Sequence, residues 1–234
     1  MNKKLILLVA GTLSVVAFTA LPSVASAGEP IATCFESGGT TAAKATCTGV
    51  VQGTGNTTLE DDNETAIQCS ATSGTADLTS GTSTGSVSLK FTGCKAAVFF
   101  TCASPGAASG EIIINNLVTH LIYLHPINGG ATTDVGIKIT SVNTTFICAS
   151  FANKTVTGKV IGRLTNPECN VAKTNHTVIF EKSGTGIQKY TQATTTGTTT
   201  DLTAGSDPAD STTSSQVGEG HIYWDTGTEV KIDC

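Results

Sequence analysis

Cysteine is the residue whose number and spacing most constrain the chemistry of this 234-residue sequence. The eight cysteines include no CxxC pair and the four histidines are scattered, so the spacing of a zinc site is absent. Disulfide bonds are therefore the favoured use of the thiols. Two short-range bonds are expected, Cys94 with Cys102 and Cys148 with Cys169. The other cysteines would then tie the N-terminal segment to itself and to the chain end: Cys34, Cys47, Cys69 and Cys234.

Groups that could transfer protons gather near the C-terminus, where Glu219 and His221 share one side of an expected strand and Asp225 follows it. The sequence offers no recognisable nucleophile beside them. The segment GTSTG has the spacing of a serine nucleophile turn, but an expected strand follows it where that motif needs a helix. We therefore expect no catalytic residue and no enzyme. The alternative is a secreted hydrolase with paired carboxylates, drawn from Glu111, Asp134, Glu219 and Asp225.

The acidic run EDDNE, residues 60–64, is the densest negative segment. Its oxygen atoms could bind Ca²⁺, but the alternating D-x-D-x-D spacing of calcium loops is absent. A solvent-exposed turn is the favoured interpretation. We expect neither a metal site nor a cofactor, with calcium binding at this run as the alternative.

Four aromatic residues are candidates for contact with a partner. Phe99 and Phe100 end the apolar run AAVFF. Alternation along a strand would place Phe100 in the core and Phe99 outside, whereas a fully exposed run would be a contact site. Tyr223 and Trp224 are adjacent, and an exposed ring there with polar neighbours would favour a glycan-binding module. A single Trp in a β domain is more often a core residue, so we expect Trp224 to be buried.

The N-terminus has the parts of a secretory signal peptide, namely a basic start, an apolar stretch and small residues that end at Ala27. We expect residues 1–27 to be removed and the protein to be secreted, with association with the cell surface as an open alternative. No other apolar stretch has membrane-spanning length, so no transmembrane segment is expected in the mature chain. The net charge of −5 becomes −7 once Lys3 and Lys4 are removed, which disfavours nucleic acid as a partner.

Short runs rich in Val, Ile, Thr and Phe recur along the mature chain, and none has helical spacing. Within residues 86–92, for example, Val87, Leu89 and Phe91 alternate with polar residues, as in a strand with one buried face. The pattern predicts an all-β protein, specifically an antiparallel β-sandwich or barrel-like domain braced by disulfides.

One domain is expected over residues 28–234, with a boundary near residue 80 as the alternative. An odd number of cysteines before that point favours one domain, because at least one of them needs a partner further along the chain. Residues 191–220 are rich in Thr, Ser and Gly and poor in apolar residues, so a mobile loop is expected there.

Glycines and cysteines at the ends of expected strands form a pattern over about residues 85–165, carried by Leu89 to Cys94, Cys102, Ser104 to Gly106, Gly110, Tyr123, Val135, Gly136, Phe146, Cys148 and Val156 to Leu164. In this pattern the chain resembles uncharacterised secreted, β-rich, disulfide-containing proteins of high-GC Gram-positive bacteria. The resemblance implies export and a β fold, and it implies no activity.

These observations predict a secreted or cell-surface β-scaffold protein that is not an enzyme and that presents polar loops to other molecules. A cell-surface protein or a glycan is the expected kind of partner, and the sequence does not identify which. A glycan-binding module is one alternative, and a secreted hydrolase is the other.

Overall fold

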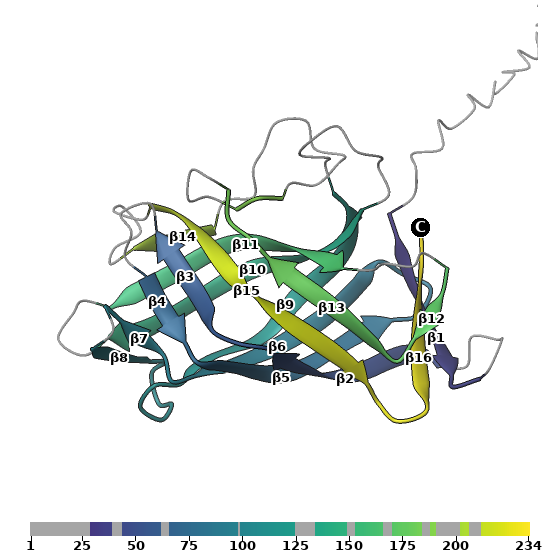
Figure 1. Cartoon of the computed structure of the whole chain (residues 1–234), viewed down its shortest axis with the longest axis horizontal. Helices are drawn as coiled ribbons and strands as arrows, with labels where there is room; N and C mark the ends of the chain where they lie inside the picture. The colour runs from purple at the N-terminus through teal and green to yellow at the C-terminus, as the bar shows by residue number, and fades with distance from the viewer. Residues whose placement is uncertain are drawn as a thin grey trace, which may run out of the picture.

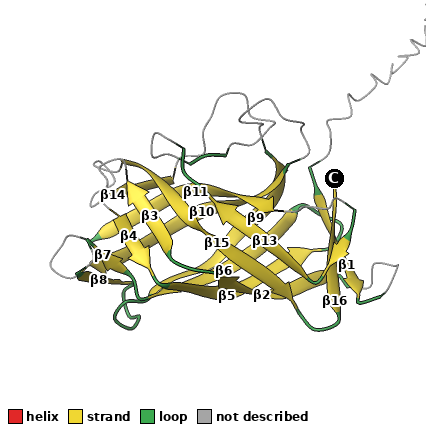
Figure 2. Ribbon diagram, in the orientation of Figure 1, coloured by secondary structure: helices red, strands yellow, loops and turns green. Residues whose placement is uncertain are grey.

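The computed structural model describes residues 29–38, 44–61, 66–97, 99–124, 134–148, 153–165, 170–183, 188–190, 202–205 and 212–234. The expected signal peptide, residues 1–27, lies outside this part of the chain. Every regular element in the described part is a β-strand (Figure 2), and no helix there is long and apolar enough to cross a membrane. The strands are β1 (Ile31–Glu36), β2 (Thr46–Gly53), β3 (Thr57–Asp61), β4 (Ala66–Cys69), β5 (Ala71–Thr79), β6 (Thr84–Thr92), β7 (Lys95–Ala96), β8 (Phe100–Ala103), β9 (Ile112–Tyr123), β10 (Val135–Cys148), β11 (Lys154–Thr165), β12 (Ala172–Lys173), β13 (Asn175–Phe180), β14 (Leu202–Gly205), β15 (Thr212–Trp224) and β16 (Thr228–Asp233).

Eight antiparallel strands pair in a ring, in the order β2, β5, β6, β9, β10, β11, β13 and β15, with β15 pairing back to β2. We call this ring the barrel (Figure 1). The all-β, antiparallel prediction is confirmed, in its barrel-like form. The sheet runs without interruption past residue 80, the position of the alternative domain boundary, because β5 and β6 on either side of it pair along most of their length.

Short strands complete the wall at one end of the barrel. β8, β7, β4 and β3 continue from the end of β10 and return to β15. On the other side of β15, β14 lies in line with β13, and both pair with β11. The wall has an unpaired stretch between them, bordered by residues 159–162 of β11 and 215–217 of β15.

A small sheet of β1, β16 and β12 lies at the opposite end of the barrel (Figure 1). Its buried side chains, Cys34, Val230 and Ile232 among them, belong to the same hydrophobic cluster as the barrel interior. The small sheet therefore covers that end of the core.

The inner face of the barrel forms the hydrophobic core, and strand alternation explains which residues reach it. On β6, Val87, Leu89 and Phe91 are buried while Ser88 and Lys90 between them are half-buried, as the sequence predicts. Burying such side chains is the main favourable contribution to folding, about 1.5 to 3 kcal/mol each. Since the two faces differ so strongly, a slip of one residue in register would expose this apolar face.

The segment expected to be a mobile loop is in part a strand. Residues 202–205 form β14, and residues 212–220 belong to β15, a wall strand of the barrel. The loop prediction is wrong there, because the inward positions of β15 include Gly218 and Gly220, which give no hydrophobic alternation to detect. Backbone hydrogen bonds to neighbours on both sides hold this strand instead. Residues 191–201 and 206–211 lie outside the described residues.

Three disulfide bonds join described residues, and their partners differ from the expected ones. Cys34 is bonded to Cys47, which ties the N-terminal segment to itself as predicted. The other two bonds join Cys69 to Cys94 and Cys102 to Cys148. The predicted Cys94–Cys102 and Cys148–Cys169 bonds are therefore wrong. The expectation that Cys69 pairs within the N-terminal segment or with the chain end is wrong as well, because its partner is Cys94. Cys234 is disulfide-bonded as well, and Cys169 lies outside the described residues.

Strand register explains this pairing. Cys69 of β4, Cys94 immediately before β7, Cys102 of β8 and Cys148 of β10 lie in one row across these strands. Within each bonded pair the Cα atoms are 3.9 Å apart. Cys94 and Cys102 are joined instead by a backbone hydrogen bond of 2.9 Å from the Cys102 N–H to the Cys94 carbonyl. Side chains stand further apart in hydrogen-bonded antiparallel pairs, so the bonds form on either side of this pair.

Candidate functional site

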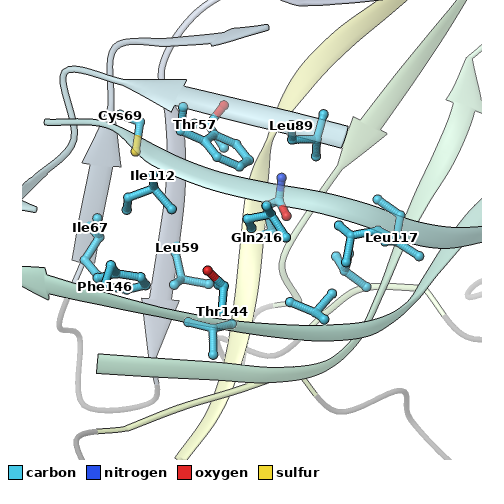
Figure 3. A pocket seen from close by; sticks show the side chains of 16 residues that line it. Thr57, Leu59, Ile67, Cys69, Leu89, Ile112, Leu117, Thr144, Phe146 and Gln216 are labelled. Carbon is cyan, nitrogen blue, oxygen red and sulfur yellow. The ribbon is translucent and has the colours of Figure 1, made fainter. Parts of the chain in front are cut away.

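Two adjoining cavities lie inside the barrel, and they are the candidate functional site. The larger, of about 70 Å³, is lined mainly by aliphatic and aromatic side chains from β3, β4, β6, β9, β10 and β11 (Figure 3). The smaller, of about 60 Å³, lies toward the β13 and β15 end that carries Trp224. Leu89 and Ile139 line both cavities, so the two cavities adjoin at these residues.

A bulge in β9 brings apolar residues on both sides of it to the inner face. The register with β6 shifts between Val87 and Leu89, and Asn116 has a left-handed backbone with φ of 56°. Asn tolerates this conformation better than most residues. Ile114 before the bulge and Leu117 after it therefore both line the larger cavity, although they are three residues apart.

β10 has a similar irregularity in its pairing. Its register with β11 shifts between Ile139 and Val142, so that Ile139 before the shift and Val142 and Thr144 after it all line the larger cavity. Bulges of this kind bend a strand and re-aim its side chains. Simple alternation along β9 and β10 therefore could not identify the cavity wall from the sequence.

Glycine leaves space on the inner face of β15. Gly220 lines the smaller cavity, and a Cβ atom added there would lie 3.8 Å from its nearest neighbour. Gln216, on the same face, contributes the longest polar side chain to the larger cavity. Figure 3 shows the Gln216 amide and the Thr144 hydroxyl among the side chains that line the cavity.

Trp224 lines the end of the smaller cavity, and His176 holds its indole ring. The Trp224 Nε1–H donates a hydrogen bond of 2.9 Å to Nδ1 of His176, and both side chains are buried. Burial lowers the pKa of His176 to about 4, and the positive charge of Lys173 also lowers it. The imidazole is therefore neutral at pH 7, and Trp224 is a core residue.

Tyr223, by contrast, is exposed on the outer face of the barrel. Its ring borders a shallow hollow of about 430 Å³ that is also lined by Val50, Gln52, Asp225 and Thr226. His221 lies beside it, with ring centroids 5.7 Å apart. Of the adjacent residues Tyr223 and Trp224, only Tyr223 therefore has an exposed ring with polar neighbours.

The two candidate phenylalanines differ in the same way. Phe99, in the turn between β7 and β8, is 83% exposed, while Phe100 at the start of β8 packs against the core cluster. Val98 of the same run lies outside the described residues. The run is therefore not a fully exposed apolar tip in its described part.

The carboxylates considered for hydrolysis are spread over the barrel. Oε1 of Glu219 lies 3.6 Å from Nε2 of His221. Nδ1 of His221 lies 2.7 Å from the Thr177 hydroxyl oxygen. Asp225 follows the end of the same strand six residues later, about 20 Å away at the rise of an extended strand. Glu111 is ion-paired with Lys90 at 2.6 Å, and it precedes β9 while Asp134 faces the other end of that strand.

The described residues contain no cluster of acidic, His or Cys side chains that could hold a metal ion. Of the acidic run, Glu60 forms an ion pair with Lys182, and residues 62–64 lie outside the described residues. The Ser83 hydroxyl, the serine of GTSTG, donates to the Glu29 carboxylate at 2.9 Å. This hydroxyl therefore pairs with a carboxylate and not with the imidazole that a serine nucleophile needs.

Comparison with protein-family models, with curated proteins and with solved structures finds no match to this chain. The interior cavities are therefore interpreted from their own geometry and chemistry.

Proposed function

We propose that the chain is an exported, non-catalytic binding protein whose barrel encloses one small, largely apolar molecule. The observation that carries this proposal is the pair of adjoining cavities, lined almost entirely by apolar side chains, in the middle of an eight-stranded ring. Barrels of this strand number either fill their interior with side chains or hold one small ligand.

Unfilled space of this size is unfavourable in a protein core. Cores are packed as densely as organic crystals, and each Å³ of residual cavity costs about 24 cal/mol. The larger cavity alone would cost about 2 kcal/mol if it stayed empty. A ligand that fills it recovers the lost dispersion contacts, and an engineered dry cavity of about 150 Å³ is known to bind benzene or xenon.

Export and the absence of catalysis are parts of the same proposal. Disulfide bonds persist in oxidising compartments, which supports export together with the N-terminal signal pattern and the resemblance to secreted bacterial proteins. The wide separation of Glu219 from Asp225 and of Glu111 from Asp134 supports a binding role over hydrolysis by either pair.

Benzene is the probe that tests the proposal. At about one hundred times its dissociation constant, it should raise the free energy of unfolding by about 3 kcal/mol in urea titrations. Val160→Ile, which adds a methylene inside the larger cavity, should weaken this effect. Val50→Ile, on the exposed outer face, should leave it unchanged. Equal unfolding curves with and without benzene, up to its solubility limit, would overturn the proposal.

The Tyr223 hollow supports a second candidate, a glycan-binding module. An exposed aromatic ring beside amide and carboxylate groups suits a sugar, whose apolar ring face stacks while its hydroxyls hydrogen-bond. A glycan array tests it, with Tyr223→Ala as the loss variant and Phe99→Ala as the matched exposed control. Binding that survives Tyr223→Ala would place the glycan elsewhere.

A further inference from the structure

Gln216 lies on the inner face of β15, where the alternate residues point into the barrel. Ile222 and Trp224 on this face belong to the core cluster, and Gly220 lines the smaller cavity. Gln216 is therefore an amide in a position that alternation assigns to the interior. It lies next to the unpaired stretch of wall between β13 and β14, and it borders the larger cavity.

The polar side chains that line the larger cavity differ in whether they form hydrogen bonds within the protein. The Thr57 hydroxyl is 2.9 Å from the Thr72 hydroxyl, so it is engaged. No hydrogen bond from another described residue reaches the Gln216 amide or the Thr144 hydroxyl. Thr144 is buried and Gln216 is half-buried. Polar groups in apolar surroundings normally have a partner, because an unmade hydrogen bond there is unfavourable.

Charge is missing from the wall of the larger cavity. No Asp, Glu, Lys, Arg or His is among its lining residues. In the smaller cavity, Asp77 is the charged lining residue, and its carboxylate accepts a hydrogen bond of 2.8 Å from the Thr48 hydroxyl. An ionic ligand buried in the larger cavity would therefore lack a counter-charge, and the smaller cavity offers none to an anion, which disfavours fatty acids.

The chemistry of the two unpaired groups defines what they can hold. A Gln amide both donates and accepts, and so does a Thr hydroxyl. Together they suit a neutral oxygen function, such as an alcohol, a ketone or an ester, and the aliphatic remainder of the wall suits an apolar body. The volumes of the two cavities together approach that of an engineered cavity that binds benzene, so this body has about six carbon atoms.

We infer that the ligand of the barrel is a neutral, mainly hydrocarbon molecule with a single oxygen function, which Gln216 and Thr144 bind. The inference rests on the proposed function, and it adds the ligand's polarity and the residues that select it. Aliphatic residues at both positions would leave a purely hydrophobic site.

Three probes of similar shape test this selection, namely benzyl alcohol, benzene and benzoate, titrated at pH 7 and followed by NMR. Benzyl alcohol should bind about tenfold more tightly than benzene, the effect of one hydrogen bond, and benzoate should bind most weakly. Gln216→Leu and Thr144→Val should each weaken benzyl alcohol binding several-fold while benzene binding is unchanged. Gln52→Leu, which changes the same residue type on the outer face, is the matched control.

The possible results distinguish the selection by Gln216 and Thr144 from the proposed binding function itself. Benzene and benzyl alcohol binding equally well, in the natural protein and in both variants, would overturn the selection and leave the apolar site in place. Failure of all three probes to bind would overturn the proposed function itself. The two variants differ in strand and in volume change, so a folding defect in one leaves the other as the test.

Discussion

The indole Nε1–H of Trp224 donates a hydrogen bond to Nδ1 of His176 inside the barrel, over 2.9 Å. The acceptor must be unprotonated for this bond to form. Burial and the Lys173 charge hold the pKa of His176 at about 4, below its usual 6.5, so the bond is present at neutral pH. It fixes the orientation of the tryptophan that lines the end of the smaller cavity.

Acid should therefore weaken the fold through His176. Above pH 6.5 the residue is neutral whether the chain is folded or unfolded. Between pH 6.5 and about 4 only the unfolded chain takes up the proton, so stability falls by about 3 kcal/mol over this range. Urea unfolding at pH 7, 5.5 and 4 measures the change.

The contribution of His176 is isolated by substitution. His176→Gln keeps a hydrogen-bond acceptor for Trp224 and removes the titration, so it should flatten the pH dependence in this range. His221→Gln on the half-exposed outer position serves as the control. An unchanged slope in His176→Gln would show that the proton is taken up elsewhere.

The disulfide bonds should differ in how much each stabilises the protein, because they close loops of different length. Removing the Cys102–Cys148 bond, which spans 46 residues, should destabilise the protein by about 4 kcal/mol. Removing Cys34–Cys47, which spans 13 residues, should cost about 3 kcal/mol. Double Cys→Ala variants and urea unfolding test the order. Mass spectrometry of non-reduced peptides tests the pairing itself, and a Cys94–Cys102 peptide would contradict the register of these strands.

Two glycine substitutions should change stability in opposite directions. In Gly220→Ala the Cβ would make an ordinary van der Waals contact at the smaller cavity, 3.8 Å from the Gln52 carbonyl oxygen, and the substitution should stabilise the protein by about 0.5 to 1 kcal/mol. In Gly74→Ala the Cβ would lie 2.1 Å from the Ser88 carbonyl oxygen, so β5 and β6 must separate and stability should fall. Thermal unfolding of the two variants measures both effects. A destabilised Gly220→Ala would mean that this space is already filled.

Gln188 substitutes for a neighbouring strand where the wall has its unpaired stretch. Its Oε1 accepts from the Ile161 N–H at 2.9 Å, and its Nε2 donates to the Lys159 carbonyl at 2.7 Å. Gln188→Ala should destabilise the protein by about 2 kcal/mol, because it leaves buried backbone groups unpaired. Gln68→Ala, at an exposed position on β4, should change stability little. If both substitutions changed stability equally, Gln188 would not be satisfying backbone groups of β11 that otherwise lack a partner.

Local patterns in the sequence were sufficient for the strands and their class. Alternation at Val87, Leu89 and Phe91 predicts the buried face of β6 correctly, because each strand face meets a uniform environment. The disulfide partners depend on register between strands that are distant in sequence, so spacing along the chain predicted the wrong bonds at Cys94 and Cys148.

The candidate site could not be predicted in the same way. The cavities arise from ring closure, from shifts of register in β9 and β10 and from glycine on β15, none of which has a local apolar signal. One signal was available, since the Asn115 and Asn116 pair inside an apolar run marks a break in alternation. Gln216 stood in a segment that composition assigned to a loop, so its inward position was missed.

The central claim is that the barrel interior accepts a small apolar molecule, and a crystal structure of the protein under xenon pressure tests it most directly. Xenon binds to dry apolar cavities and is seen by its anomalous scattering. We expect ordered xenon inside the barrel next to Leu89 and Ile139, the residues that line both cavities. An interior without xenon, in crystals where xenon occupies surface sites, would contradict the account.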